Sequence, residues 1–123
     1  MKHIFLIFSS LISMAAVAET FTCVAWYNDV DDKIYRKVME QQSYDKDYYE
    51  ADIKEMTYGM LFSNREKYEP GFIIYDNSTE NFMTADGAMK QIPNTVVSTA
   101  SAHFYKSAGE GKRIVAQVSC SVE

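Results

Sequence analysis

The stretch TVVSTASAHFYKSAGEGKRIVAQVSCSV, residues 95–122, decides the fold because it contains two alternating segments around a glycine-containing connection. Apolar residues occupy most of the alternate positions of residues 96–106 and 112–122, and the connection SAGEG spans residues 107–111. Alternation with a period of two is typical of a strand that buries one face, and a short connection with glycine is typical of a β-hairpin. The sequence therefore predicts an antiparallel hairpin at residues 95–122.

The predicted register brings the even-numbered positions of residues 96–106 and 112–122, which carry most of the apolar side chains, onto one face. Its pairs are Lys106 with Lys112, Phe104 with Ile114, Ala102 with Ala116, Ala100 with Val118, Ser98 with Cys120 and Val96 with Val122. The opposite face then carries polar and aromatic side chains, among them His103 and Tyr105. Agreement between the apolar pattern and the position of the turn is what specifies strand register.

The rest of the chain is a series of strand-like segments separated by turn formers. Residues 21–27 (FTCVAWY) are apolar on both faces, which favours a central strand, and the cluster NDVDDK ends it. Pro70-Gly71 predicts a turn before FIIYD, and Gly59 indicates a bulge or a close approach of two chain segments.

Short strands with frequent turns, and no repeat or linker, predict an all-β antiparallel sandwich or barrel. The alternative is an α+β fold with one short helix near residues 78–90, capped by Ser78.

Cys23 and Cys120 are the only cysteines, and they lie near the two ends of the chain, 97 positions apart. An even cysteine count in an exported chain predicts a disulfide, which requires the two Cα atoms to come within about 7 Å. We therefore expect the first and last strands to be neighbours or to face each other across the core. The sequence has no Cys-x-x-Cys motif, so the bond is interpreted as structural rather than redox-active.

The N-terminal residues have the pattern of a secretory signal peptide. Lys2 precedes an uncharged stretch from Ile4 to Val17, and Ala16 and Ala18 form an Ala-x-Ala cleavage motif. The apolar stretch is shorter than the about 20 residues of a membrane-spanning helix, which favours cleavage over an uncleaved anchor. We therefore predict a signal peptide at residues 1–18, a single β-rich domain at residues 19–123, and a periplasmic or secreted bacterial protein.

Charge and residue types restrict the function classes. Loss of Lys2 takes the formal net charge from −5 to −6, so the sequence favours a basic protein partner over nucleic acid or anionic lipid. Asp29, Asp31 and Glu40 have the spacing of calcium ligands, but Lys33 stands where the loop needs a ligand, which leaves an acidic turn. No metal or cofactor is predicted, no membrane insertion follows signal cleavage, and no catalytic group surrounds the mature domain's single histidine, so no enzyme is predicted.

One segment combines tyrosines with carboxylates, a composition suited to docking on a basic protein surface. Its residues are Tyr44, Asp45, Asp47, Tyr48, Tyr49, Glu50 and Asp52. We therefore expect a small exported non-enzymatic binding protein, a partner or inhibitor of a basic protein. The alternative is a carrier of a small apolar ligand in a β-barrel cavity beside Ala100 and Ala102, unless Trp26, Met60, Phe62 and Phe72 fill that space.

Overall fold

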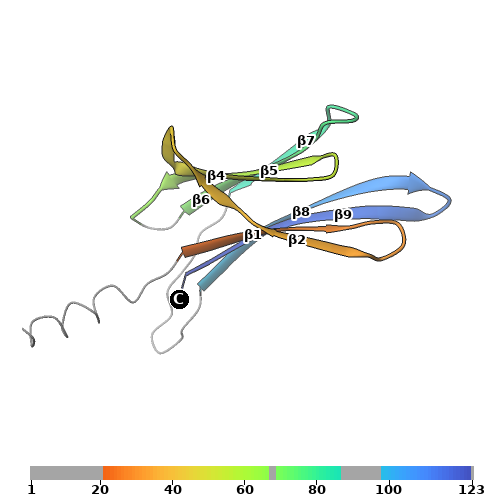
Figure 1. Ribbon diagram of the computed structural model, residues 1–123, viewed down its shortest axis with the longest axis horizontal. Coiled ribbons are helices and arrows are strands. Elements are labelled where there is room, and N and C mark those ends of the chain that lie inside the picture. The colour runs from red at the N-terminus through yellow and green to blue at the C-terminus, as the bar shows by residue number, and fades with distance from the viewer. Residues whose placement is uncertain (1–20, 67–68, 87–97, 123) are drawn as a thin grey trace, which may run out of the picture.

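The computed structural model describes residues 21–66, 69–86 and 98–122, which form two antiparallel β-sheets packed face to face (Figure 1). The four-stranded sheet has the order β2-β1-β9-β8, with β1 (Phe21–Asn28), β2 (Ile34–Val38), β8 (Ser98–Gly109) and β9 (Lys112–Val122). The five-stranded sheet runs in sequence order, with β3 (Glu40–Gln42), β4 (Asp45–Ile53), β5 (Met56–Asn64), β6 (Glu69–Asp76) and β7 (Phe82–Asp86). The all-β prediction is confirmed, as a sandwich rather than a closed barrel.

The helix considered near residues 78–90 is not formed where the structure describes that region. Residues 82–86 are strand β7, because Met83 and Ala85 pack inward while the residues between them face solvent, the period of a strand. Residues 87–90 of that prediction, and the predicted signal peptide at 1–18, lie outside the described residues. Within the described ranges, no helix has the length and hydropathy needed to cross a bilayer.

The C-terminal hairpin is confirmed, but its predicted register was wrong by two residues. Ala102 pairs with Val118, and Ser98 pairs with Val122. The connection is a two-residue turn at Glu110 and Gly111, whose φ angles of 54° and 74° match a type I′ hairpin turn, and a bulge precedes it. The predicted loop of five residues was therefore too long. The strands shift by an even number of positions, so the inward face is the one predicted; Val96 lies outside the described residues.

The core is formed by inward side chains from both sheets. It contains Cys23, Ala25, Tyr27, Met39, Ala51, Ile53, Met56, Tyr58, Met60, Phe62, Phe72, Ile74, Ala102, Ala116, Val118, Cys120 and Val122. Trp26, which we expected as a core residue, points outward because its neighbours Ala25 and Tyr27 occupy the inward positions of β1. Pro70 and Gly71, predicted as a turn, lie instead within β6, where Pro70 is buried opposite Phe62.

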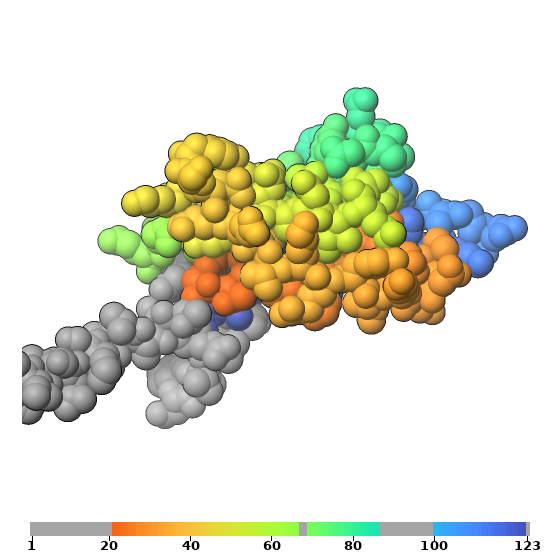
Figure 2. Space-filling view, in the orientation of Figure 1, coloured from red at the N-terminus to blue at the C-terminus, as the bar shows by residue number. Residues whose placement is uncertain are grey.

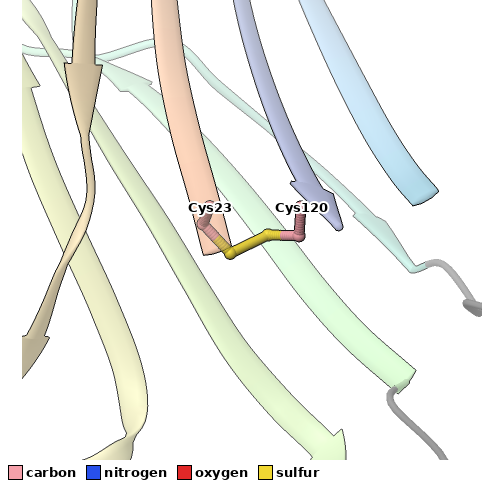
Figure 3. The surroundings of a disulfide bond; sticks show 2 residues. All are labelled: Cys23 and Cys120. Atoms are coloured by element: carbon pink, nitrogen blue, oxygen red, sulfur yellow. A yellow bond between two sulfur atoms is a disulfide. The ribbon is translucent and has the colours of Figure 1, made fainter. Parts of the chain in front are cut away.

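The Cys23–Cys120 disulfide joins the first and last strands, as predicted. The two residues are directly opposite each other on β1 and β9, with a Cα–Cα distance of 4.0 Å, and both are buried (Figure 3). The bond therefore lies within one sheet, between neighbouring strands, rather than across the core. Cys23 shares the inward face of Ala25 and Tyr27, as the alternation of β1 predicted.

The two ends of the sandwich differ. The β1–β2, β4–β5, β6–β7 and β8–β9 turns all lie at one end, at the right of Figure 1, and the disulfide lies toward the other. In the space-filling view, the chain from β2 into β4 (orange to yellow) runs across the junction of the two sheets on this side (Figure 2).

Candidate binding site on the five-stranded sheet

The outer face of the five-stranded sheet contains a shallow groove of about 310 Å³. It is lined by Tyr48, Leu61, Ser63, Gly71, Phe72, Ile73, Thr84 and Asp86, which come from β4, β5, β6 and β7. Gly71 of β6 lies in this lining at an outward position, directly opposite Leu61 of β5, so a side chain is missing there. The absence of side chains at the centre of a sheet face is what leaves room for a groove.

Tyr48 lies across the glycine of the neighbouring strand. A Cβ atom at Gly59 would come within 2.8 Å of both the Tyr48 hydroxyl and Ile73 Cγ2, so only glycine fits there. This confirms the close approach predicted at Gly59; the bulge of β5 lies further along, between Phe62 and Asn64. The Tyr48 hydroxyl donates a hydrogen bond of 2.9 Å to Glu50 Oε2. Burial, followed by this hydrogen bond, raises the pKa of Tyr48 to about 12.

The same face exposes large apolar side chains beside the groove. Leu61 is 47% exposed and Phe82 is 59% exposed, and the Phe82 ring stacks on Tyr75 with a centroid distance of 6.4 Å. Of these two, Leu61 lines the groove and Phe82 lies outside it, and the outer face of the other sheet also exposes Ile34, Val38 and Tyr105.

Carboxylates surround this apolar area. Glu40 and Glu50 are directly paired across β3 and β4, and Asp52 and Asp86 also occupy outward positions. Among the strand residues described on this face, Lys46 is the one cation at an outward position. A second, polar pocket of about 180 Å³ adjoins the carboxylates, and there Lys37 of the other sheet donates to the backbone oxygen of Asp52. The face as a whole therefore favours a cationic partner.

The structure divides the tyrosine- and carboxylate-rich segment between two faces. Tyr48, Glu50 and Asp52 point outward to the groove side, whereas Tyr49 packs inward against Phe21, with ring centroids 5.4 Å apart. The division follows from the strand period of two, which sends consecutive side chains of β4 to opposite faces.

The other residues predicted for this site lie at the start of β4. Asp47 forms an ion pair of 2.6 Å with Arg65, and Asp45 Oδ1 accepts the backbone N–H of Asp47. Tyr44 is exposed in the turn before β4. Asp45 and Asp47 are therefore outside the groove, whereas the Tyr44 ring lies 6.4 Å from that of Tyr48, which lines it. Sequence reasoning missed Leu61 and Ile73, which line the groove from other strands.

A polar cluster joins the two sheets at the end that carries the four turns. Lys106 Nζ of β8 lies 3.0 Å from Glu55 Oε2 and 2.8 Å from Asp76 Oδ2, and it donates to the Ser78 hydroxyl at 3.0 Å. The Tyr27 hydroxyl donates to Glu55 Oε1 at 2.7 Å. Asp76 Oδ1 accepts the hydroxyl and backbone N–H of Ser78, while Oδ2 has the Lys106 ammonium as its contact.

The electrostatics of this cluster keep its groups charged. Burial alone would raise the pKa of Asp76, but hydrogen bonds from Lys106 and Ser78 outweigh it and hold that pKa well below its usual range. The pKa of Glu55 is lowered as well, since the hydrogen bonds from Tyr27 and Lys106 outweigh its burial. Burial opposes the charge of Lys106, yet its two carboxylate partners raise its pKa. A fixed, mutually satisfied ion cluster supports the structure more readily than it transfers protons.

Among the described residues, no three histidine, cysteine, aspartate or glutamate side chains gather as metal ligands. In the acidic β1–β2 turn, the Asp29 carboxylate stabilises the turn, because its Oδ1 accepts hydrogen bonds from the backbone N–H groups of Asp31 and Lys33. No protein-family model matches the chain, and neither a curated protein nor a solved structure shows significant similarity to it.

Proposed function

We propose that this protein is an exported, non-enzymatic binding protein that holds a basic protein partner on the outer face of its five-stranded sheet. The observation that carries the proposal is the groove at Gly71, which has a largely apolar lining that includes Asp86, with Glu50 hydrogen-bonded to the Tyr48 of that lining. The proposal keeps the basic partner expected from the acidic sequence. It moves the binding residues from the continuous segment 44–52 to Tyr48, Leu61 and Ile73, with carboxylates from several strands.

Export to the periplasm or the extracellular space is part of the same proposal. The disulfide is consistent with an oxidising compartment, because cytosolic thiols are kept reduced. The signal-like sequence of residues 1–18 supports it as well.

The groove favours an extended segment in which apolar and basic residues alternate. Apolar side chains of such a segment contact Leu61 and Ile73, while its cations reach Glu50 and Asp86 at the edges. The alternative function, an apolar ligand inside a barrel, has no such observation behind it, because the fold is a two-sheet sandwich and both pockets described above are open to the surface.

A short synthetic peptide of alternating lysine and leucine is the probe for this proposal, and its dissociation constant is measured by calorimetry. Leu61→Thr removes exposed apolar area from the groove and should weaken binding by roughly fivefold to tenfold, since tenfold corresponds to about 1.4 kcal/mol. Ile34→Thr is the matched control, because Ile34 is equally apolar and exposed but lies on the other sheet.

A second pair of variants tests the charges. Glu50→Gln with Asp86→Asn should weaken binding of the same peptide and reduce its salt dependence, whereas Asp31→Asn in the β1–β2 turn should change neither. Equal affinity for a peptide of alternating glutamate and leucine, or equal loss in the Ile34→Thr control, would contradict the proposal.

A further inference from the structure

The outer face of the four-stranded sheet carries no carboxylate at any outward position that the structure describes. The charged residues there are Arg36 and Arg113, and the face also presents Trp26, His103 and Tyr105. This composition is unexpected in a chain with a formal charge of −5, and it is the reverse of the acidic face on the five-stranded sheet.

Both arginines of this face are held over aromatic rings. The Arg36 guanidinium carbon lies 5.3 Å from the centre of the Trp26 ring, and that of Arg113 lies 4.9 Å from the centre of the Tyr105 ring. Among the described residues, neither arginine has a carboxylate or hydrogen-bond partner. A stacked guanidinium is pre-organised and keeps its N–H donors available, which suits it to bind a carboxylate, sulfate or phosphate group.

Around these arginines, neutral hydrogen-bonding groups share the face with the apolar residues Ile34 and Val115, which both pair with Asn28. Strand register places Arg36, Trp26, Gln117 and His103 in one row across all four strands. The imidazole of His103 is parallel to the Tyr105 ring within 8°, and Tyr105 is 59% exposed. Amide, imidazole and phenol groups, which both donate and accept hydrogen bonds, suit a ligand rich in hydroxyl groups.

The spacing of the two cations indicates how densely the ligand is charged. Arg36 and Arg113 are two strands and four residues apart, which corresponds to roughly 16 Å between their backbone positions. Duplex DNA carries one charge per about 1.7 Å of its axis and attracts dense cationic patches. Two arginines at this distance fit a sparsely charged polymer better than a nucleic acid.

We propose that the outer face of the four-stranded sheet binds an acidic polysaccharide, whose carboxylate groups pair with Arg36 and Arg113 and whose hydroxyl groups contact Gln117 and His103. An acidic protein is a poorer match. Protein interfaces depend on buried apolar or aromatic anchors that fill pockets, and neither pocket described above is lined by a residue of the polar row. The exposed apolar residues Ile34 and Val38 lie on edge strand β2, beside the polar row rather than within it.

The test uses oligogalacturonate, a carboxylated oligosaccharide, against a neutral maltooligosaccharide of the same length. Trp26 is the only tryptophan of the chain, so its fluorescence reports binding at this face directly, and affinity electrophoresis gives a second readout. We expect saturable binding of oligogalacturonate, at least tenfold weaker binding of the neutral oligosaccharide, and progressive loss of oligogalacturonate binding as salt is added.

Substitution of the arginines separates this site from general charge effects. Arg36→Gln with Arg113→Gln should weaken oligogalacturonate binding at least tenfold. The affinity of the lysine variant Arg36→Lys with Arg113→Lys should lie between those of the wild type and the glutamine variant, because lysine keeps the positive charge but lacks the planar guanidinium with its paired N–H donors. Arg65→Gln is the matched control, since Arg65 follows β5 of the other sheet and pairs with Asp47; it should leave the affinity unchanged.

Three outcomes would overturn the proposal. They are the absence of oligogalacturonate binding by the wild-type protein, equal binding of the neutral oligosaccharide, and unchanged affinity in the glutamine variant. Polyglutamate that binds more tightly than oligogalacturonate and displaces it would also overturn it, in favour of an acidic protein partner. Retention of the lysine–leucine peptide by the glutamine variant shows that the protein is folded and that the two faces act separately.

Discussion

The disulfide between the terminal strands should supply a large part of the stability of this domain. Cys23 and Cys120 are 97 positions apart, and cross-linking a loop of roughly 100 residues lowers the entropy of the unfolded chain by an amount worth about 4.7 kcal/mol in the chain-entropy model. Typical domains have a free energy of unfolding of about 5–15 kcal/mol. We therefore expect that the protein without its disulfide retains its fold but with a small margin.

Packing of the two sulfur atoms in the folded core adds a smaller contribution to the stability. Both sulfur atoms lie in the core, with Cys23 1% exposed and Cys120 fully buried. Removing one buried heavy atom costs about 1 kcal/mol, so Cys23→Ala with Cys120→Ala should cost roughly 2 kcal/mol more than reduction of the bond alone. Comparing the oxidised protein, the reduced protein and the double alanine variant therefore separates the cross-link from the packing.

Urea unfolding followed by the fluorescence of Trp26 measures these differences. The slope of unfolding free energy against urea is about 1–3 kcal/mol per molar for small proteins, so a loss of about 4.7 kcal/mol on reduction should lower the midpoint by roughly 1.5–5 M. The reduced protein should also have a steeper slope, because its unfolded chain is no longer closed into a loop and exposes more surface. A loss below about 1 kcal/mol on reduction, with an unchanged slope, would refute the loop-closure reasoning.

Two further predictions concern the glycines of the groove and the polar cluster. Gly59→Ala should lower the free energy of unfolding by about 1–3 kcal/mol in the same urea experiment, because the added Cβ would lie 2.8 Å from two neighbouring side-chain atoms. Gly71→Ala should have nearly the stability of the wild type, because the nearest atoms to its added Cβ would be 3.5 Å away. Lys106→Met should lower the free energy of unfolding by about 3–5 kcal/mol near neutral pH, because it leaves Asp76 buried and charged without its cation. This loss should become smaller as pH falls toward the lowered pKa values of Asp76 and Glu55. Unfolding curves recorded at several pH values measure it. A loss that stayed constant down to pH 2 would contradict this assignment.

The sign of that pH dependence follows from the directions of the pKa shifts. Asp76 and Glu55 have lowered pKa values, so their contribution is complete above about pH 4 and is lost as pH falls through the folded values. Lys106 has a raised pKa, so its contribution is complete below about pH 10 and is lost as pH rises further. The cluster therefore stabilises the protein fully across the neutral range.

The strand pattern and the disulfide were predictable from the sequence because both depend on short-range rules. The alternating pattern of β9 predicted correctly that Ala116, Val118 and Cys120 share one face. With two cysteines in the chain, a single disulfide pairing was possible. The register of the hairpin was not predictable, because it depends on Glu110 adopting a positive φ angle, which its residue type does not indicate. With Glu110 in that conformation the hairpin has a two-residue turn, whereas the sequence SAGEG predicted a five-residue loop.

The candidate groove was harder to predict because it is assembled across strands. Residues that are adjacent in the tyrosine-rich segment point to opposite faces, so Tyr48 and Tyr49 end in different environments. Tyr48 instead meets Gly59 and Ile73, which belong to two other strands. A single sequence shows which residues share a strand face, but it does not show which strands are neighbours, and the groove depends on both.

The two outer faces differ in charge, so the net charge of the chain does not describe the electrostatics of either face alone. Packed sheets are separated by about 10 Å, and their side chains project further to either side, whereas the Debye length at physiological salt is about 8 Å. A ligand on the four-stranded sheet is therefore largely screened from the carboxylates at Glu50 and Asp86, and it responds mainly to Arg36 and Arg113. Because a strand sends alternate residues to opposite sides, a sandwich can collect acidic side chains on one outer face and leave the other free of them. An overall charge of −5 is thus compatible with a surface that binds anions.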